Sequence, residues 1–321
     1  MIYNQWYVIL ESREIGKKKP IKVTRLNETL VVWRDQNGKV NCIADRCCHR
    51  GASLSCGKLV NGKAECPFHG FLFDGEGKVK LIPANGKNAE IPDSQKVNAY
   101  TTYENYGLIW IWHGDNDKKT AEPFFFKELA DMSYSTFIDP WPVHYSRCIE
   151  NQLDVVHIPF VHKTTIGAGN KTLVNGPVVV REGELLTFYV NNVVDDGKTT
   201  QLKANEMTDY KKLFHLQFHY PNIWKNPISA KFQVFAAFVP VDNENTLIYL
   251  RNYQSFLKIP ILKQAVNYFM KLSNIVILRQ DKRIVITQLP KKSEVKMDER
   301  LILGDKPIIE YRKHREELMT K

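Results

Sequence analysis

Two short segments, each with a cysteine and a histidine, constrain this 321-residue chain more than any other feature. The first contains Cys47 and His49, and the second contains Cys66 and His69. Two thiolates and two imidazoles on paired turns of a small domain can hold one metal assembly. A tetrahedral zinc site is one candidate, although zinc-binding sequences usually pair cysteine with cysteine and histidine with histidine. One ligand of each kind per segment favours a [2Fe–2S] cluster with thiolates on one iron and imidazoles on the other.

The cysteine distribution favours metal binding over disulfide formation. Five of the six cysteines lie between residues 42 and 66, and the start of the chain has no basic segment followed by an apolar one. We therefore expect a cytoplasmic protein, in which clustered cysteines more often bind metals. The longest apolar stretch, residues 232–241, is shorter than the roughly 18 residues of a membrane span, so no span is expected. The net charge of +10 is compatible with an acidic partner, and no motif indicates nucleic acid.

The first 116 residues are predicted to form a small all-β domain. Apolar segments at 28–34 and 39–44 flank Asn37-Gly38, a dipeptide typical of hairpin turns because both residues tolerate positive φ. Residues 106–113 form another apolar segment, and a charged stretch begins at Asp115. We therefore expect one domain at 1–116 and a second at 117–321.

The second domain begins with strand-like segments and ends with a helical one. The strand-like segments are 177–180, 185–190, 213–220, 231–239 and 246–253. From 261 to 289 the apolar residues recur at helical spacing, and Pro290 ends the pattern. Strands followed by a long helix favour an antiparallel α+β domain.

A second group of possible metal ligands lies within residues 150–162. Asp154 precedes His157 by three residues and would share a helix face with it, whereas His162 would lie about 140° from His157 on a straight helix. Pro159 must bend or stop such a helix, which could bring the two imidazoles together. For this segment alone, two unrelated histidines at a helix end are the better explanation.

The predicted late helix has an acid, Asp281, in its apolar stripe. Ile277, Ile284 and Val285 lie within about 60° of it around the helix axis. A buried carboxylate is costly unless it is neutralised, paired or bound to a metal, so an internal salt bridge is one alternative. Two histidines and one carboxylate form the facial ligand set of non-haem iron oxygenases, and an iron would explain the histidines as well as the acid.

Taken together, these segments resemble the Rieske non-haem iron oxygenase family. The loops CCHRGASLS and CPFHGFLFDGEGK are similar to the family's cluster motifs, and residues 151–162 fit its pattern N-x2-D-x2-H-x4-H. The resemblance implies an α+β fold, with an N-terminal all-β Rieske domain before an antiparallel-sheet, helix-grip catalytic domain with a long C-terminal helix. The implied ligands of the [2Fe–2S] cluster are Cys47, His49, Cys66 and His69, and those of a mononuclear Fe²⁺ are His157, His162 and Asp281. Cys48 departs from the family, which usually has proline there.

The resemblance also implies a function. It indicates a terminal oxygenase of the compact homotrimeric type, like the vanillate and dicamba demethylases, which uses O2 and electrons from a reductase, directly or through a ferredoxin. The substrate would be a small organic molecule that is hydroxylated or demethylated, and monooxygenation is favoured over cis-dihydroxylation. Asp154 would bridge the iron to the cluster of an adjacent subunit, and Asn151 would support the iron ligands. The second ligand set argues against an electron carrier that has only the cluster and against a zinc-stabilised binding module.

The residues that bind the substrate are not predicted by any of these patterns. His215, Gln217 and His219 alternate with apolar residues and so give one segment a polar face. This face could line a polar pocket, but a solvent-facing stripe is the better prediction.

Overall fold

The computed structural model describes residues 1–257 and 259–320, and the chain forms two compact units. The first comprises Tyr3–Pro123, and the second comprises Met1–Ile2 and Phe124–Lys321. The first unit therefore extends past the predicted boundary at residue 116. Its last segment is held by Trp6, whose indole Nε1 donates to the carbonyl and the hydroxyl of Thr120. None of the helices in the described ranges combines the length and apolar composition of a membrane span.

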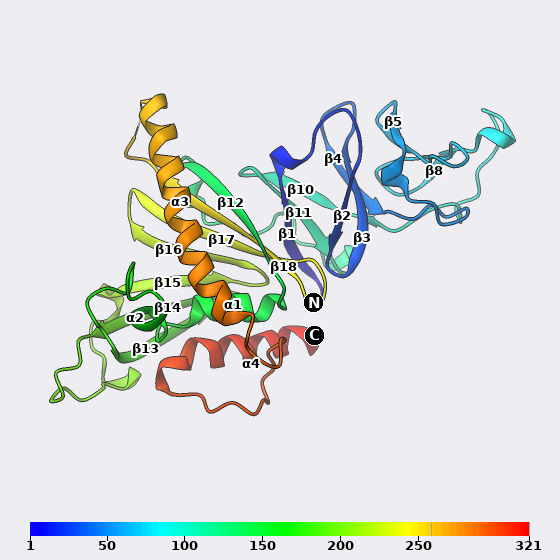
Figure 1. Cartoon of the computed structure of the whole chain (residues 1–321). Helices are drawn as coiled ribbons and strands as arrows, with labels where there is room; N and C mark the ends of the chain where they lie inside the picture. The colour runs from blue at the N-terminus through cyan, green and yellow to red at the C-terminus, as the bar shows by residue number, and fades with distance from the viewer. Residues whose placement is uncertain (258, 321) are drawn as a thin grey trace. The chain divides into compact units, whose positions relative to one another are not determined.

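The first unit consists of short antiparallel strands in three sheets (Figure 1). The sheet orders are β1-β11-β10, β2-β3-β4-β9 and β5-β6-β7-β8. The strands are β1 (Gln5–Glu11), β2 (Ile21–Arg25), β3 (Glu28–Arg34), β4 (Val40–Ala44), β5 (Lys58–Val60), β6 (Lys63–Glu65), β7 (Leu72–Phe73), β8 (Val79–Leu81), β9 (Ala99–Tyr100), β10 (Thr102–Asn105) and β11 (Leu108–His113). A buried cluster that includes Trp33, Ile43, Leu54 and Phe73 joins the second and third sheets. The predicted all-β architecture is confirmed.

The predicted hairpin connects β3 to β4. The Asp35 carboxylate accepts the backbone N–H groups of Asn37 and Lys39 at 2.9 and 3.0 Å. Gly38 has a φ of +82°, the left-handed conformation that glycine adopts without steric cost. The turn pairs Arg34 with Val40 and so sets the register of the two strands that precede the first cysteine–histidine loop.

The second unit contains one antiparallel sheet of seven strands in the order β12-β18-β17-β16-β15-β14-β13. Its strands are β12 (Ser133–Trp141), β13 (Leu173–Glu182), β14 (Leu185–Val193), β15 (Phe214–His219), β16 (Ile223–Ser229), β17 (Phe232–Pro240) and β18 (Thr246–Gln254). Its helices are α1 (Tyr145–Leu153), α2 (Ile158–Val161), α3 (Pro260–Val285) and α4 (Lys306–Thr320). The five predicted strand segments correspond to β13, β14, β15, β17 and β18, and the antiparallel α+β prediction is confirmed.

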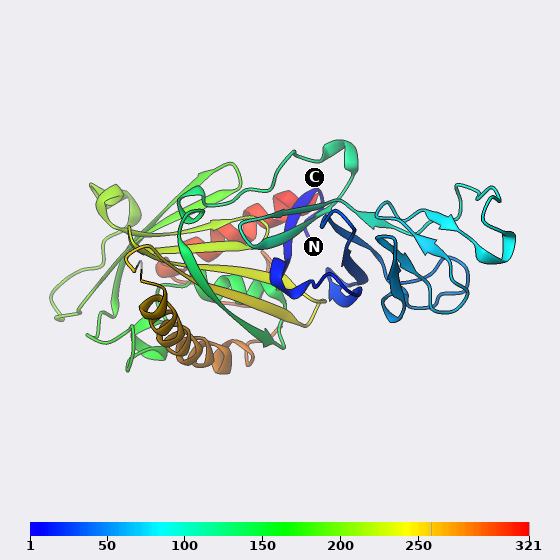
Figure 2. The ribbon, with the colours of Figure 1, turned by 90° about the horizontal axis from the view of Figure 1, so that it is seen from above.

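The core of the second unit lies between the sheet and its helices. Leu186 and Phe218 from the sheet pack in one buried cluster with Leu278 and Val285 of α3. Figure 1 shows α1 and α3 crossing the sheet, and Figure 2 shows α3 on one side of the strands. Helix α3 ends four residues before the predicted end at 289, and α4 is a second C-terminal helix that the sequence patterns do not predict.

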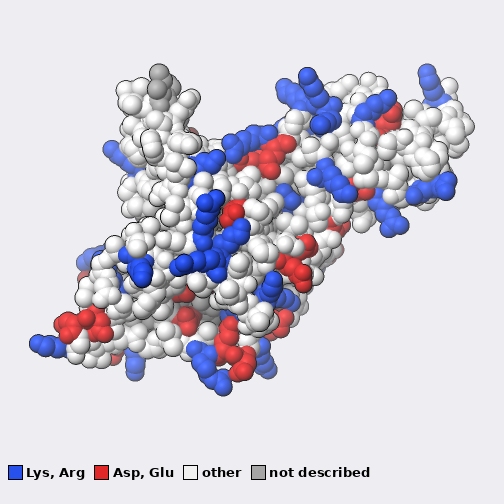
Figure 3. Space-filling view, in the orientation of Figure 1, with Lys and Arg blue, Asp and Glu red and all other residues white. Residues whose placement is uncertain are grey.

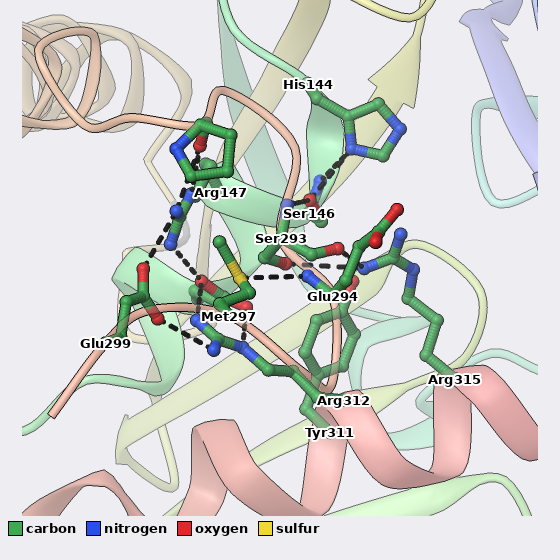
Figure 4. Close-up of polar contacts among 12 residues, drawn as sticks. His144, Ser146, Arg147, Ser293, Glu294, Met297, Glu299, Tyr311, Arg312 and Arg315 are labelled. Carbon is green, nitrogen blue, oxygen red and sulfur yellow. Dashed lines mark hydrogen bonds and ion pairs between the residues drawn. The ribbon is translucent and has the colours of Figure 1, made fainter. Parts of the chain in front are cut away.

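Four buried or half-buried charged residues join α1 to α4 and to the segment after α3 (Figure 4). Glu150 and Glu299 each contact both Arg147 and Arg312, at distances of 2.7 to 3.0 Å. Arg147 also donates to the carbonyl of Pro290. Two arginines alternate with two glutamates, so the charges of this cluster balance. It fixes the C-terminal half of α1, where the carbonyl of Glu150 accepts the N–H of Asp154.

Candidate metal centres

The two cysteine–histidine loops have the same backbone hydrogen bonds. The N–H of Cys47 donates to the carbonyl of Ala52, and its carbonyl accepts the N–H of Gly51. In the second loop, the N–H of Cys66 donates to the carbonyl of Phe71, and its carbonyl accepts the N–H of Gly70. Both glycines have positive φ, +76° and +72°, as a tight turn at this position requires. The loops follow β4 and β6 and thus present matched ligands from two hairpins.

Within these loops Cys47 and Cys66 are buried, whereas the two imidazoles and the additional cysteine, Cys48, are exposed. Cys47 and Cys66 are 3% and 2% exposed, whereas His49 and His69 lie at the surface with ring centroids 4.7 Å apart. Burial raises the pKa of the Cys47 thiol to about 11, and the neighbouring Cys66 thiol contributes to the rise. A metal would supply the positive charge that stabilises the two buried thiolates, so the donor set fits an iron–sulfur cluster.

The first loop is also held by Asp45, a residue that the sequence patterns do not single out. One carboxylate oxygen accepts the backbone N–H of Ser55 at 2.7 Å. The other accepts the hydroxyls of Ser53 and Ser55 at 2.5 and 2.7 Å. Asp45 is 6% exposed, and it therefore ties the end of the loop to the strand that precedes it.

In the second unit, His157, His162 and Asp281 converge. Their ligand atoms all lie within 4.8 Å of one another. The Nε2 atoms of His162 and His157 lie 2.9 and 3.5 Å from Oδ1 of Asp281. His162 and Asp281 are 1% and 2% exposed, so the carboxylate lies in the interior as the helical pattern predicts. Ile284, predicted in the same stripe, is instead 45% exposed, because the buried stripe is formed by Leu278, Asp281 and Val285.

The predicted helix through residues 150–162 is wrong in one respect. Helix α1 ends at Leu153, Asp154 has an extended backbone with ψ of 123°, and α2 begins at Ile158. Pro159 lies in the first turn of α2, where its missing N–H has little cost, so it starts a helix and does not bend one. The Asp154 carboxylate accepts the N–H groups of Val156 and His157 at 2.6 and 3.2 Å. This turn, and not a shared helix face, directs Asp154 toward His157.

The outer nitrogen atoms of both imidazoles face acceptors. Nδ1 of His157 lies 3.5 Å from Oδ2 of Asp154, and Nδ1 of His162 lies 2.8 Å from Oε1 of Gln280. Both Nε2 atoms are thereby turned toward Asp281. In the described part of the chain, the buried Oδ1 of Asp281 has no hydrogen-bond donor. Two imidazole nitrogens and an unsatisfied buried carboxylate oxygen fit a divalent iron with open positions on its other side.

The neighbouring groups of the site shift the pKa values of Asp154 and His162. Burial would raise the pKa of the Asp154 carboxyl, but hydrogen bonding and charge at His157, together with the backbone N–H groups, lower it. Burial would lower the pKa of His162, but the nearby carboxylate of Asp281 and the contact with Gln280 raise it. The site therefore keeps Asp154 ionised and favours a positive charge between His162 and Asp281.

Comparison with known protein families identifies both units. Residues 5–101 match the Rieske [2Fe-2S] domain, and residues 141–321 match the vanillate O-demethylase oxygenase C-terminal domain. The chain belongs to the Rieske non-haem iron oxygenases. The predicted family is thus confirmed, and with it the two cofactors, a [2Fe–2S] cluster and a mononuclear iron.

Individual relatives of this Rieske oxygenase cover different shares of it. Protein TIC 55 of Arabidopsis thaliana is 32% identical over 165 residues, which is 50% of this chain and 30% of that protein. The vanillate O-demethylase oxygenase subunit of a Pseudomonas species is 32% identical over 197 residues, 60% of this chain and 54% of that protein. The matches thus span 30% and 54% of the lengths of these two relatives. The structure of Pseudomonas putida CBB5 NdmA with caffeine has a TM-score of 0.80 and 26% identity, and it covers 99% of this chain and 91% of NdmA.

Three other residues named in the sequence analysis have no contact with the converging side chains of His157, His162 and Asp281. Asn151 lies on α1, and its buried Nδ2 has no acceptor among the described residues. Gln217 donates to Thr187, and His219 stacks on Phe124 with ring centroids 3.9 Å apart. Their neighbours Leu216 and Phe218 pack with the helices, so the polar stripe is on the other face of the sheet. It does not line the site formed by His157, His162 and Asp281.

Proposed function

We propose that this chain is a terminal oxygenase that hydroxylates or demethylates a small organic substrate with O2. One observation carries the proposal: the chain combines two matched cysteine–histidine loops with the convergence of His157, His162 and Asp281. An electron carrier with only the cluster would not need the second set, and neither would a zinc-stabilised module. When bound, the cluster supplies electrons and the mononuclear iron supplies a site for O2.

The proposed ligand roles follow the chemistry of the side chains. In the first unit the two thiolates bind one iron of the cluster and the two imidazoles bind the other, through Cys47, Cys66, His49 and His69. In the second unit the ligand atoms are Nε2 of His157, Nε2 of His162 and Oδ1 of Asp281. Asn151 is proposed to support these ligands from α1.

Asp154 is proposed to connect neighbouring copies of the chain. One oxygen is used by two backbone N–H groups, and the other faces His157 at 3.5 Å. The side chain is 28% exposed, so the second oxygen keeps a lone pair for a donor from outside. We propose that this donor is His69 of the partner subunit, because His69 is exposed in its own unit. Such a head-to-tail contact is heterologous and closes into a ring, here a homotrimer.

The names of two relatives support a substrate class. One is an O-demethylase of vanillate, and the NdmA structure contains caffeine. Both molecules are small and flat, with a methyl group on a heteroatom. We propose a substrate of this kind, and we favour monooxygenation over cis-dihydroxylation.

The proposed electron donor is a reductase, acting directly or through a ferredoxin. A basic surface favours an acidic donor, and the chain has a net charge of +10. Lys and Arg side chains gather over the C-terminal half of α3 (Figure 3), where Arg279, Lys282 and Arg283 lie. The proposed cytoplasmic location agrees with the need for such a donor.

The test combines metal analysis with a turnover screen. Protein purified without oxygen is assayed for iron, acid-labile sulfide and zinc, and three irons with two sulfides per chain are expected from the two centres. Methylated aromatic and heteroaromatic compounds are then screened for substrate-dependent NADH consumption with a surrogate reductase, and ¹⁸O2 is traced into the product. One labelled oxygen in a hydroxylated product, or a demethylated product released together with one formaldehyde, supports monooxygenation, and two labelled oxygens in one product support cis-dihydroxylation. Zinc in place of iron, or a cluster without the additional iron, would contradict the proposal.

A further inference from the structure

Gln280 contacts the imidazole that lies deepest in the proposed iron site. Its Oε1 lies 2.8 Å from Nδ1 of His162, a residue 118 positions earlier in the chain. On the other side of the same ring, Nε2 lies 2.9 Å from Oδ1 of Asp281. Consecutive residues of α3 thus contact the two nitrogen atoms of one imidazole.

The chemistry of an amide oxygen decides which nitrogen carries the proton. A carbonyl oxygen can only accept a hydrogen bond, so Nδ1 of His162 must be the donor. In a neutral imidazole the other nitrogen then has the lone pair, and this nitrogen faces Asp281. The contact with Gln280 therefore prepares Nε2 for a metal and fixes the ring plane.

Gln280 is itself held in place. The hydroxyl of Thr165 lies 3.1 Å from the same Oε1, which is nearer than its other acceptor, the carbonyl of His162 at 3.3 Å, and the N–H of Thr165 donates to that carbonyl at 2.8 Å. The two lone pairs of Oε1 are therefore both used, one by His162 and one by Thr165. This closed arrangement links α3 to the turn after α2 and leaves His162 a single orientation.

We propose that Gln280 is a positioning residue for the mononuclear iron and that it acts by fixing the tautomer and orientation of His162. The inference rests on the proposed iron site and adds a residue that the N-x2-D-x2-H-x4-H motif does not contain. Metal-binding histidines depend on such an acceptor, and its loss typically lowers metal affinity about 10- to 100-fold.

The experiment measures Co²⁺ binding to protein that contains its cluster but lacks the mononuclear metal. Gln280→Leu removes the acceptor, and Gln280→Asn keeps an amide but shortens it by one methylene. We expect both variants to bind Co²⁺ about 10- to 100-fold more weakly than the wild type, and the visible spectrum of bound Co²⁺ to change because His162 is no longer held. Gln280→Glu keeps an acceptor at the same reach and should restore affinity. Thr165→Val should have a smaller effect of the same sign.

Two neighbours in the same groove provide matched controls. Arg279 and Arg283 line an open groove of about 490 Å³ with Gln280, and neither is a proposed ligand or ligand support. Arg279→Gln and Arg283→Gln should bind Co²⁺ like the wild type. Sulfide content and thermal unfolding show whether each variant is folded and contains its cluster.

The outcomes separate this inference from the proposed function. If the wild type binds Co²⁺ while folded Gln280→Leu or Gln280→Asn binds it within about twofold, the role of Gln280 is refuted and the iron site is retained. If Gln280→Leu does not fold, Gln280→Asn and Gln280→Glu still decide the matter, because only Gln280→Glu keeps an acceptor that reaches Nδ1 of His162. If the wild type itself does not bind Co²⁺, the proposed iron site fails and the inference fails with it.

Discussion

Replacement of Arg312 by methionine should destabilise the second unit by several kcal/mol. Arg312 lies on α4 and is 4% exposed. It donates to both oxygens of Glu150, at 2.7 and 3.0 Å, and contacts Glu299 at 2.7 Å. Methionine would keep most of the apolar volume but remove all three contacts. Glu150, 5% exposed, would then share Arg147 with Glu299, and the buried cluster would have one negative charge too many.

The size of the effect follows from the burial of the pair. Removal of one partner of a buried ion pair costs about 3 to 5 kcal/mol, mainly because the other charge is left without compensation. A unit of about 200 residues loses roughly 2 to 4 °C of melting temperature per kcal/mol, so the expected decrease is about 6 to 20 °C. Because an uncompensated charge causes the loss, Glu150→Gln added to Arg312→Met should recover part of the stability.

Thermal unfolding followed by circular dichroism measures the decrease, and the visible absorption of the cluster reports separately on the first unit. Arg300→Met is the matched control, because Arg300 pairs with Asp298 while both side chains are more than 90% exposed. Its effect should stay below about 1 kcal/mol, as for other surface pairs. A loss below about 1 kcal/mol in Arg312→Met would refute the reasoning, and so would a double variant that is less stable than the single one.

Three further predictions follow from the contacts of the two units. Asp154→Asn should keep both metals but lower turnover about 10- to 100-fold, because the side chain that faces His157 loses its charge. Iron analysis and steady-state turnover measure the two effects. Full activity would contradict the proposed bridge through Asp154. Gly57→Ala should reduce the sulfide content and destabilise the first unit by at least about 1 to 3 kcal/mol, because the added Cβ would lie 1.9 Å from the carbonyl oxygen of Glu65. The control is Gly16→Ala, which should be close to neutral because the space around its Cβ is open. Burial would raise the pKa of Glu299, but hydrogen bonds from Arg312 and Arg147 lower it below the usual 4.5. The ionised Glu299 carboxylate therefore stabilises the fold above pH 4.5, and this stabilisation is lost as the pH falls through the lowered pKa of Glu299. The wild-type melting temperature should therefore fall more steeply below pH 4.5 than that of Glu299→Gln, and parallel curves would contradict this assignment.

Local patterns predicted the elements and the residue types of the two sites, but not the contacts that orient them. Alternation and turn residues are properties of neighbouring residues, so the hairpin at Gly38 and five of the strands of the large sheet could be predicted from the sequence. Helical spacing likewise put Asp281 in the interior, where it is 2% exposed. The turn at Asp154 could not be predicted in this way, because it depends on the hydrogen bonds of the Asp154 carboxylate to the N–H groups of Val156 and His157, whereas the local pattern has only Pro159 as a helix breaker. Asp45 and Gln280 have no local signal, since their roles depend on partners that the fold brings to them.

The two imidazoles of the proposed iron site have different acceptors, and the roles proposed for Gln280 and Asp154 differ accordingly. Oε1 of Gln280 has both lone pairs in use, for His162 and Thr165, and can accept no further donor. Asp154 carries a charge, and its second oxygen faces His157 without a short hydrogen bond, so it has capacity for one more donor. In the proposed trimer, an electron from the cluster of a partner subunit would therefore pass through Asp154 and His157 and not through His162. If this holds, Gln280 variants should lose metal affinity while any metal-loaded fraction still turns over, whereas Asp154 variants should retain the metal and lose turnover. Two variants that failed in the same way would show that the imidazoles have no such division of roles.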